Sequence, residues 1–229
     1  MDVPQFPSLA PDTNPLLRSQ TVEAVPLENL TCPTILVRKR TARRELRDVR
    51  RRKTAAEAIA GLTHDLEIFG FTKGQFSLLD LLIAALQITG PAQMSLSTWT
   101  AARHEIQSLD ELQRSGLLTG MRWLVDFTFC RRDPEAAHQV RKTFGADAIR
   151  VANTHCKFAV LRNDTWSLVI RTSMNLNMNP RFEDFTVAHD EQLSAFLGTL
   201  LDDIWTRQKR ELAEGTSHAE VRRHFVADL

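Results

Sequence analysis

The segment from Asn153 to Phe185, NTHCKFAVLRNDTWSLVIRTSMNLNMNPRFEDF, contains two apolar runs joined by a short polar turn. Residues 155–161 (HCKFAVL) and 166–174 (WSLVIRTSM) have the composition of buried strands, and RNDT between them is typical of a tight turn. We therefore expect an antiparallel hairpin, in which the end of the second strand returns beside the start of the first.

This hairpin would gather polar side chains at one end of the sheet. Side chains two apart on a strand share a face, so His155 and Lys157 are expected to point the same way. The returning strand brings Ser173 and Asn175 beside them, and Glu183 closes the polar stretch that follows. A nucleophile or base, a fixed cation and amide donors are what attack on a phosphodiester requires.

Upstream of the hairpin, strand-like and helix-like segments alternate regularly. Strands are expected at residues 65–72, 92–100, 121–129 and 148–153, and helices at 77–90, 101–116, 133–145 and, after the hairpin, 190–212. This order predicts an α/β fold with a mixed β-sheet flanked by helices on both faces.

The N-terminal part differs in composition from the rest. Residues 1–34 are rich in proline and are expected to form an extended leader, and residues 38–53 carry ten Lys or Arg against two acids. The spacing of apolar residues predicts a basic helix from Thr41 to Ala60, so we divide the chain into a leader with a helical arm (1–61) and a second domain (62–229). Clustered arginines suit a nucleic-acid backbone; the candidate ligands are Arg40, Arg43, Arg44, Arg47, Arg50, Arg51 and Arg52.

The overall composition excludes several classes of protein. A hydrophobic content of 43% and a charged content of 25% are ordinary for a globular protein, and the sequence has neither a membrane-spanning run nor a signal peptide. The three cysteines are widely spaced, and neither they nor the histidines have the spacing of metal ligands. We therefore expect a cytoplasmic protein with no metal and no cofactor.

The pattern His155-x-Lys157, then Ser173-x-Asn175, then Glu183 resembles the phospholipase D superfamily. The motif of that family is H-x-K-x4-D followed by G-S-x-N and, in its short nuclease branch, a downstream Glu. The resemblance covers roughly residues 62–210 and points to the single-motif members encoded by phages or bacteria. It implies a homodimer that forms one active site from two chains and uses a phosphohistidine intermediate without metal.

Carried over to this sequence, the resemblance gives each motif residue a role. His155 would attack phosphorus while its symmetry mate protonates the leaving oxygen. Lys157 and Asn175 would hold the non-bridging oxygens, with assistance from Ser173. Glu183 would accept a hydrogen bond from the other ring nitrogen of a histidine and so fix its tautomer.

The sequence departs from the family pattern at two positions and leaves three functions open. Arg162 stands at the position of the motif Asp, and Thr172 at the position of the Gly in G-S-x-N. The first interpretation is a homodimeric nuclease whose substrate is nucleic acid, with DNA favoured over RNA. Its expected location is the cytoplasm, which is that of a bacterial host if a phage encodes the protein. The alternatives are a catalytically silent DNA-binding or structural phage protein and a lipid-directed phosphodiesterase, although no membrane-facing apolar element is apparent.

Overall fold

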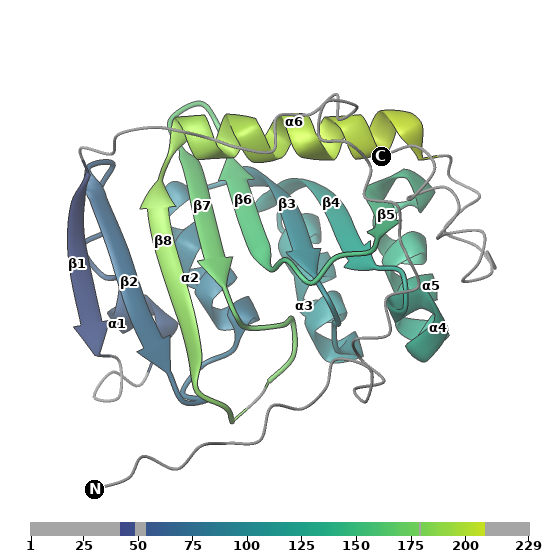
Figure 1. Cartoon of the computed structure of the whole chain (residues 1–229), viewed down its shortest axis with the longest axis horizontal. Coiled ribbons are helices and arrows are strands. Elements are labelled where there is room, and N and C mark those ends of the chain that lie inside the picture. The colour runs from purple at the N-terminus through teal and green to yellow at the C-terminus, as the bar shows by residue number, and fades with distance from the viewer. Residues whose placement is uncertain (1–41, 49–53, 179, 209–229) are drawn as a thin grey trace, which may run out of the picture.

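The computed structural model describes residues 42–48, 54–178 and 180–208. These residues form one mixed β-sheet of eight strands with helices on both faces (Figure 1), which confirms the predicted α/β class. The strand order is β1-β2-β8-β7-β6-β3-β4-β5, so the hairpin of β6 and β7 lies near the middle of the sheet.

The strands are β1 (Arg43–Asp48), β2 (Leu66–Thr72), β3 (Ala92–Thr98), β4 (Leu118–Asp126), β5 (Ile149–Ala152), β6 (Phe158–Arg162), β7 (Ser167–Thr172) and β8 (Glu183–His189). The helices are α1 (Ala55–Ile59), α2 (Leu78–Thr89), α3 (Arg103–Arg114), α4 (Phe129–Arg132), α5 (Pro134–Phe144) and α6 (Glu191–Arg207), with a short 3-10 helix η4 (Ala146–Ala148) before β5.

Local sequence signals place the elements in the middle of the chain close to their predicted positions. Helix α2 begins with a capping box, in which Ser77 Oγ accepts from the Asp80 amide and the Asp80 carboxylate accepts from the Ser77 amide. Helix α5 begins with Asp133 as N-cap and Pro134 in the first turn. These signals act within a few residues, which is why sequence analysis locates them.

The N-terminal basic helical arm is a wrong prediction over the residues that the structure describes there. Residues Arg43–Asp48 form the edge strand β1, which runs parallel to β2, and the helix α1 begins only at Ala55. On β1, Arg47 donates to the carbonyl oxygens of Ala58 and Ala60, at the end of α1, at 2.9 Å each. Pairing with β2 and packing on α1 favour the strand over the helix. Arg40, Arg50, Arg51 and Arg52 lie outside the described residues.

The strand β8, like β1, was not predicted, because its residues follow directly on the polar stretch after β7 and were expected to belong to that loop. It runs antiparallel to both β2 and β7 and so joins the two halves of the sheet. The last helix follows directly and is described as far as Arg207, with residues from 209 onward outside the described part.

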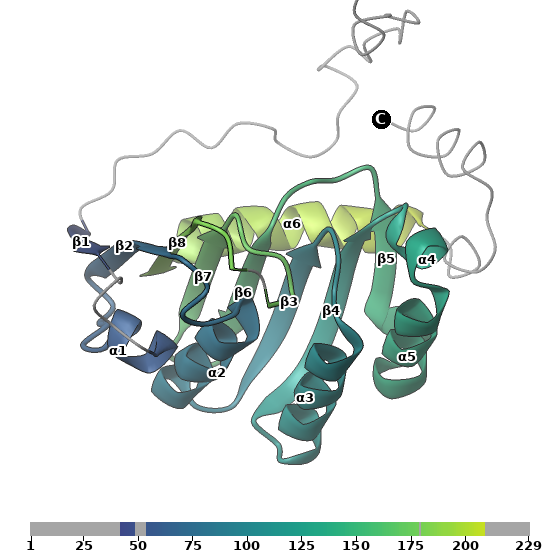
Figure 2. The same cartoon turned by 90° about the horizontal axis from the view of Figure 1, so that it is seen from below.

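Two apolar cores cover the two faces of the sheet (Figure 2). The larger lies between the sheet and the helices α1 to α5, and the smaller lies between the sheet and α6, where Val160 and Val169 pack with Leu197 and Leu201. Helix α6 crosses the sheet near one end of the strands (Figure 1). Among the described residues, it leaves the rest of that face open. None of the described helices has the length and apolar character needed to cross a bilayer.

Candidate active site

The segment that carries His155 and Lys157 lies just before β6, since the strand begins at Phe158 rather than at His155. Two neighbouring strands nevertheless hold this segment in place. Ser97 Oγ of β3 donates to the Cys156 carbonyl oxygen at 2.9 Å, and the Thr172 amide at the end of β7 donates to the Lys157 carbonyl oxygen at 3.3 Å. The backbone between the two motif residues is therefore fixed from both sides.

The side chains of His155 and Lys157 contact each other, as their spacing predicts. Lys157 Nζ lies 3.2 Å from His155 Nδ1 and donates to the His155 carbonyl oxygen at 3.1 Å. An ammonium group has three donors and no acceptor, so His155 Nδ1 must accept and the neutral ring carries its proton on Nε2. His155 is exposed, which leaves Nε2 accessible to a ligand.

Ser173 lies beyond the end of β7, where the hairpin brings it into the same pocket as His155 and Lys157. Its hydroxyl donates to the carboxylate of Glu183 and accepts from the Asp184 amide at 3.0 Å. Glu183 is thus close to the site but bonds Ser173, and no hydrogen bond joins it to His155 within one chain. The predicted contact of Glu183 with a histidine would need a rearrangement or a second copy of the chain.

Asn175 lies in the loop after β7, which is anchored at the buried Leu176. The Leu176 amide donates to the Thr100 carbonyl oxygen at 3.2 Å, and the Leu176 carbonyl oxygen accepts from the Ala102 amide at 2.8 Å. Asn175 is not among the residues that line the pocket of His155, and its Oδ1 is buried without a hydrogen-bond partner. A buried amide oxygen without a partner is costly, and such groups need an explanation that is often functional.

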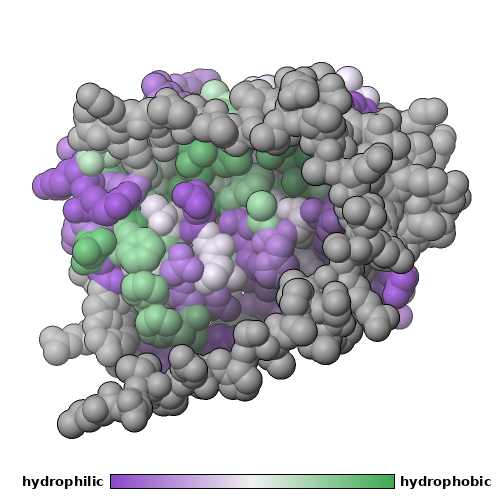
Figure 3. Space-filling model, viewed as in Figure 1, coloured by the Kyte–Doolittle hydropathy of each residue, from purple (hydrophilic) through white to green (hydrophobic). Residues whose placement is uncertain are grey.

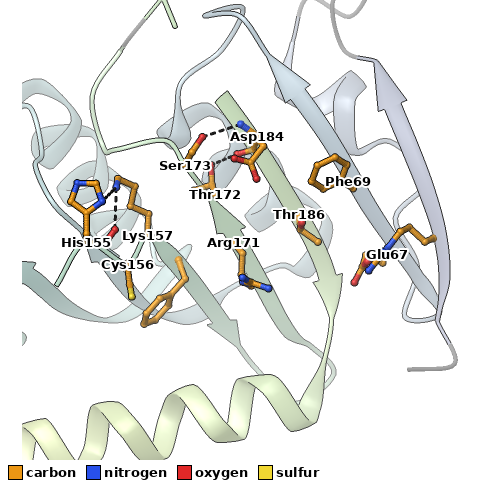
Figure 4. A pocket seen from close by; sticks show the side chains of 12 residues that line it. Glu67, Phe69, His155, Cys156, Lys157, Arg171, Thr172, Ser173, Asp184 and Thr186 are labelled. Carbon is orange, nitrogen blue, oxygen red and sulfur yellow. Dashed lines mark hydrogen bonds and ion pairs between the residues drawn. The ribbon is translucent and has the colours of Figure 1, made fainter. Parts of the chain in front are cut away.

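The site opens into a pocket of about 570 Å³ on the α6 face of the sheet. Figure 4 shows His155 and Lys157 on one side of this pocket, Glu67 on the other, and Arg171 between them. The complete lining is Arg44, Glu67, Phe69, His155, Cys156, Lys157, Phe158, Arg171, Thr172, Ser173, Asp184 and Thr186. Three cations face two carboxylates in this lining, so the pocket carries a small excess of positive charge.

Two cations of the pocket were not assigned to the site by sequence reasoning. Arg171 is exposed on β7, opposite Phe158 of β6, and it shares the strand face of Ser173 because the two are two residues apart. Arg44 was expected on a separate arm, but the pairing of β1 with β2 places it against Glu67, with which it forms an ion pair. The alternation of the strand is the signal that could have identified Arg171.

The two departures from the family pattern have structural partners. Arg162 Nε donates to Ser194 Oγ of α6 at 2.6 Å, and its guanidinium also bonds the Ser194 carbonyl oxygen, at the end of the hairpin far from His155. Thr172 Oγ1 donates to the Asp184 carbonyl oxygen at 2.6 Å and accepts from the Met174 amide at 3.0 Å. Arg162 ties the sheet to α6, and Thr172 ties the ends of β7 and β8 together.

An aromatic side chain lies against His155 on the side of β3. The ring centroids of Trp99 and His155 are 5.7 Å apart, and the guanidinium of Arg132 lies 3.8 Å from the centroid of Trp99. Arg132 also donates to the Trp99 carbonyl oxygen at 2.9 Å. A cation over an indole ring stabilises such an arrangement, so Trp99 is held as a fixed wall beside the imidazole.

No group of three or more His, Cys, Asp or Glu side chains that could hold a metal ion occurs in the part of the chain that the structure describes. The groups that could bind an anion at the site are instead the Lys157 ammonium, the Arg171 guanidinium and the donors at the end of β7.

Comparison with known proteins finds similarity in structure only. The chain is similar to polyphosphate kinase from Porphyromonas gingivalis, with 13% identity and a TM-score of 0.47 over 62% of this chain and 26% of that one. It is also similar to Nuc, a phospholipase D family member from Salmonella typhimurium, with 14% identity and a TM-score of 0.43 over 62% of this chain and 95% of that one. No family model matches the sequence, and no curated protein matches it either. Function is therefore argued from the residues of the site.

Proposed function

We propose that the protein is a metal-independent phosphodiesterase that hydrolyses nucleic acid through a phosphohistidine formed on His155. The observation that carries this proposal is the meeting of His155, Lys157 and Ser173 in one positively charged pocket. An imidazole supplies the nucleophile, and fixed donors and an ammonium stabilise the charge that develops on the non-bridging oxygens.

In the first step of this reaction, His155 Nε2 forms a bond to phosphorus while the bond from phosphorus to the leaving oxygen breaks. The leaving oxygen takes a proton from a second histidine, which acts as general acid in its imidazolium form and becomes a neutral imidazole. In the second step, water gives a proton to that imidazole and attacks phosphorus, and the bond between phosphorus and His155 breaks. The proton balance thus requires two histidines.

A second copy of the chain is the source that we propose for the other histidine. A twofold dimer places two identical sites face to face, with His155 of one copy as nucleophile and His155 of the second copy as acid. The acid must be an imidazolium with protons on both ring nitrogens, because a neutral ring that lost its Nε2 proton would be left as an imidazolate. The nucleophile needs the lone pair on Nε2, and therefore a proton on Nδ1.

Lys157 offers a physical route to both states, because each of them holds a proton on Nδ1. Its ammonium occupies His155 Nδ1 in the structure, but a bound phosphate would be a stronger, charged acceptor for the same group. When Lys157 turns to a non-bridging oxygen, Nδ1 becomes free to hold a proton and to donate to a carboxylate such as Glu183. In this scheme, substrate binding itself prepares the nucleophile.

The nucleic-acid substrate is proposed from the basic residues next to the pocket. Arg44 and Arg171 line it together with Lys157, and the segment 38–53 carries a net charge of +8 from ten basic and two acidic residues. Clustered arginines displace counterions from a phosphate backbone and bind it regardless of sequence.

The test is hydrolysis of labelled single-stranded and double-stranded DNA by the purified protein in excess EDTA, beside His155→Ala. We expect cleavage by the wild type only, together with an acid-labile, alkali-stable phosphorus label on the protein that His155→Ala lacks. His138→Ala, on α5, is the matched control and should cleave like the wild type. Activity that requires added magnesium, or that survives His155→Ala at the wild-type rate, would overturn the mechanism.

A further inference from the structure

We infer that the α6 face of the sheet carries a binding track for single-stranded nucleic acid, which runs from His155 across β7, β8 and β2 to Arg44 on the edge strand. This inference rests on the proposed function only for the position of the scissile phosphate. It adds the strand type of the substrate, the path of the bound chain across the sheet and the residues that hold it.

The three cations of the track lie on, or directly before, three strands of the sheet and line one pocket. Lys157 precedes β6, Arg171 is on β7, and Arg44 is on β1, and all three line the pocket of His155. Because strands lie about 4.8 Å apart, β6 and β1 are separated by about 19 Å. A single phosphate cannot span that length, so the cations fit a run of several nucleotides.

Arg171 is the cation most available to a ligand. It is exposed and has no hydrogen-bond or ion-pair partner among the described residues, whereas Arg44 is paired with the buried Glu67. Figure 4 shows Arg171 between Lys157 and Glu67, in the middle of the proposed path. Its role as a phosphate ligand can therefore be tested without removing a contact that holds the fold.

One aromatic ring, Phe69, lines the same pocket as these cations, and two exposed rings continue from it. Phe71 and Phe182 stack with their centroids 5.0 Å apart, and Phe69 meets Phe71 edge to face. Phe182 is 62% exposed and Phe71 is 38% exposed, although rings of this size are normally buried. In Figure 3, apolar groups gather over the β1 and β2 side of this face, directly next to polar groups in its middle.

This pairing of cations with open rings selects a single strand over a duplex. A duplex keeps the faces of its bases inside the stack and offers its phosphates and groove edges to a protein, so it could use the cations but not the rings. Single strands present base faces that stack on aromatic side chains while the backbone follows a positive groove. The exposed ring of Phe182 is where a base would stack.

The experiment measures binding in the His155→Ala background, so that cleavage does not interfere. Fluorescence anisotropy follows a labelled oligothymidylate of about 20 nucleotides and a duplex of equal length. We expect Phe182→Ala to lower the affinity for the single strand about tenfold and the affinity for the duplex less than about twofold. Phe182→Trp should preserve both affinities. Arg171→Gln should lower the slope of log affinity against log salt by about 0.7 for the single strand.

Arg114→Gln is the matched control, because this exposed arginine is on α3 at the opposite face of the sheet and should change neither affinity nor slope. The track would be overturned if Phe182→Ala bound oligothymidylate as tightly as the His155→Ala protein without it. It would also be overturned if Phe182→Ala lost the same affinity for the single strand and for the duplex. A change from dimer to monomer in light scattering of Phe182→Ala would overturn it as well, because it would show that the rings join two copies.

Hydrolysis of bis(p-nitrophenyl) phosphate separates this inference from the proposed function. That diester is too small to span the track, so it reports on the chemistry at His155 without the rings. If the His155→Ala protein still hydrolyses it at the wild-type rate, the proposed mechanism fails. The anisotropy of the Phe182 and Arg171 variants decides the track in either case.

Discussion

Lys157 Nζ lies 3.2 Å from His155 Nδ1, and the same ammonium group donates to the carbonyl oxygen of His155. A cation that bonds the ring nitrogen in the free protein determines which nitrogen holds the proton. In the proposed mechanism, Lys157 therefore has a second role besides binding phosphate. We propose that it couples the arrival of an anion to the protonation state of the imidazole, and this coupling can be tested by substitution.

Lys157→Met should lower turnover of a phosphodiester by about 10²-fold to 10³-fold, because it removes both a charge near the non-bridging oxygens and the partner of Nδ1. Steady-state kinetics on bis(p-nitrophenyl) phosphate would show this loss mainly in kcat. Lys142→Met, at an exposed position of α5, removes the same charge far from the pocket and should leave kcat unchanged. Wild-type kcat in Lys157→Met would refute a role for this ammonium in the reaction.

Arg47 should contribute to stability rather than to nucleic-acid affinity, contrary to its assignment among the basic ligands. Its side chain is 8% exposed, bonds both Ala58 and Ala60, and pairs with Glu45 at 2.9 Å. Arg47→Gln should therefore lower the free energy of unfolding by about 1–3 kcal/mol in urea denaturation. Arg43→Gln, on the same strand but exposed, should change it by less than about 0.5 kcal/mol. Equal stability of the two variants would show that the contacts with α1 contribute nothing.

Glu105 should make the protein less stable as the pH rises from about 4.5 to 7. Burial, followed by the nearby charge of Asp80, raises the pKa of Glu105 to about 7, and its Oε2 has no hydrogen-bond partner. The folded state therefore holds a proton that the unfolded state releases near its ordinary pKa of 4.5, so folding is penalised progressively over this interval.

Glu105→Gln removes that proton equilibrium and should raise the unfolding free energy at pH 8 on the order of 2 kcal/mol. Its stability should also become less dependent on pH between about 5 and 7. Urea denaturation at several pH values checks both statements. A variant that is less stable than the wild type at pH 8 would contradict them.

Gly70 should not tolerate a side chain, because β2 passes close to a buried ring at this point. A Cβ at Gly70 would lie 2.7 Å from Phe185 Cζ and 3.2 Å from the Arg47 carbonyl oxygen. Gly70→Ala should destabilise the fold by about 1–3 kcal/mol, measured by thermal or urea unfolding. Gly120→Ala is the control, since its Cβ would meet its nearest neighbour, Gln93 Cγ, at an ordinary 3.6 Å. If both variants unfold at the same midpoint, the close approach is not a real constraint.

The sequence by itself determined the class of the fold and the three motif residues that meet in the pocket. Amphipathic periods and helix caps act over a few residues, so the strands from β2 to β7 and the helices α2, α3 and α5 could be read directly from the chain, whereas the short helix α4 was not predicted. His155 and Lys157 are two residues apart, and Ser173 returns through a hairpin with a short turn, so their meeting also depends on local geometry.

Only the tertiary structure decided that the two neighbours of β2 in the sheet, β1 and β8, are strands. The basic segment of β1 has arginines at spacings that suit a helix as well as a strand, and its pairing with β2 and packing on α1 resolve that ambiguity. β8 follows a polar loop, and it becomes a strand because both β2 and β7 offer it hydrogen bonds. Pairing between segments far apart in the chain leaves no periodic signal in either of them. For that reason, the sequence could not reveal that Arg44 shares a pocket with His155 or that Arg162 holds α6.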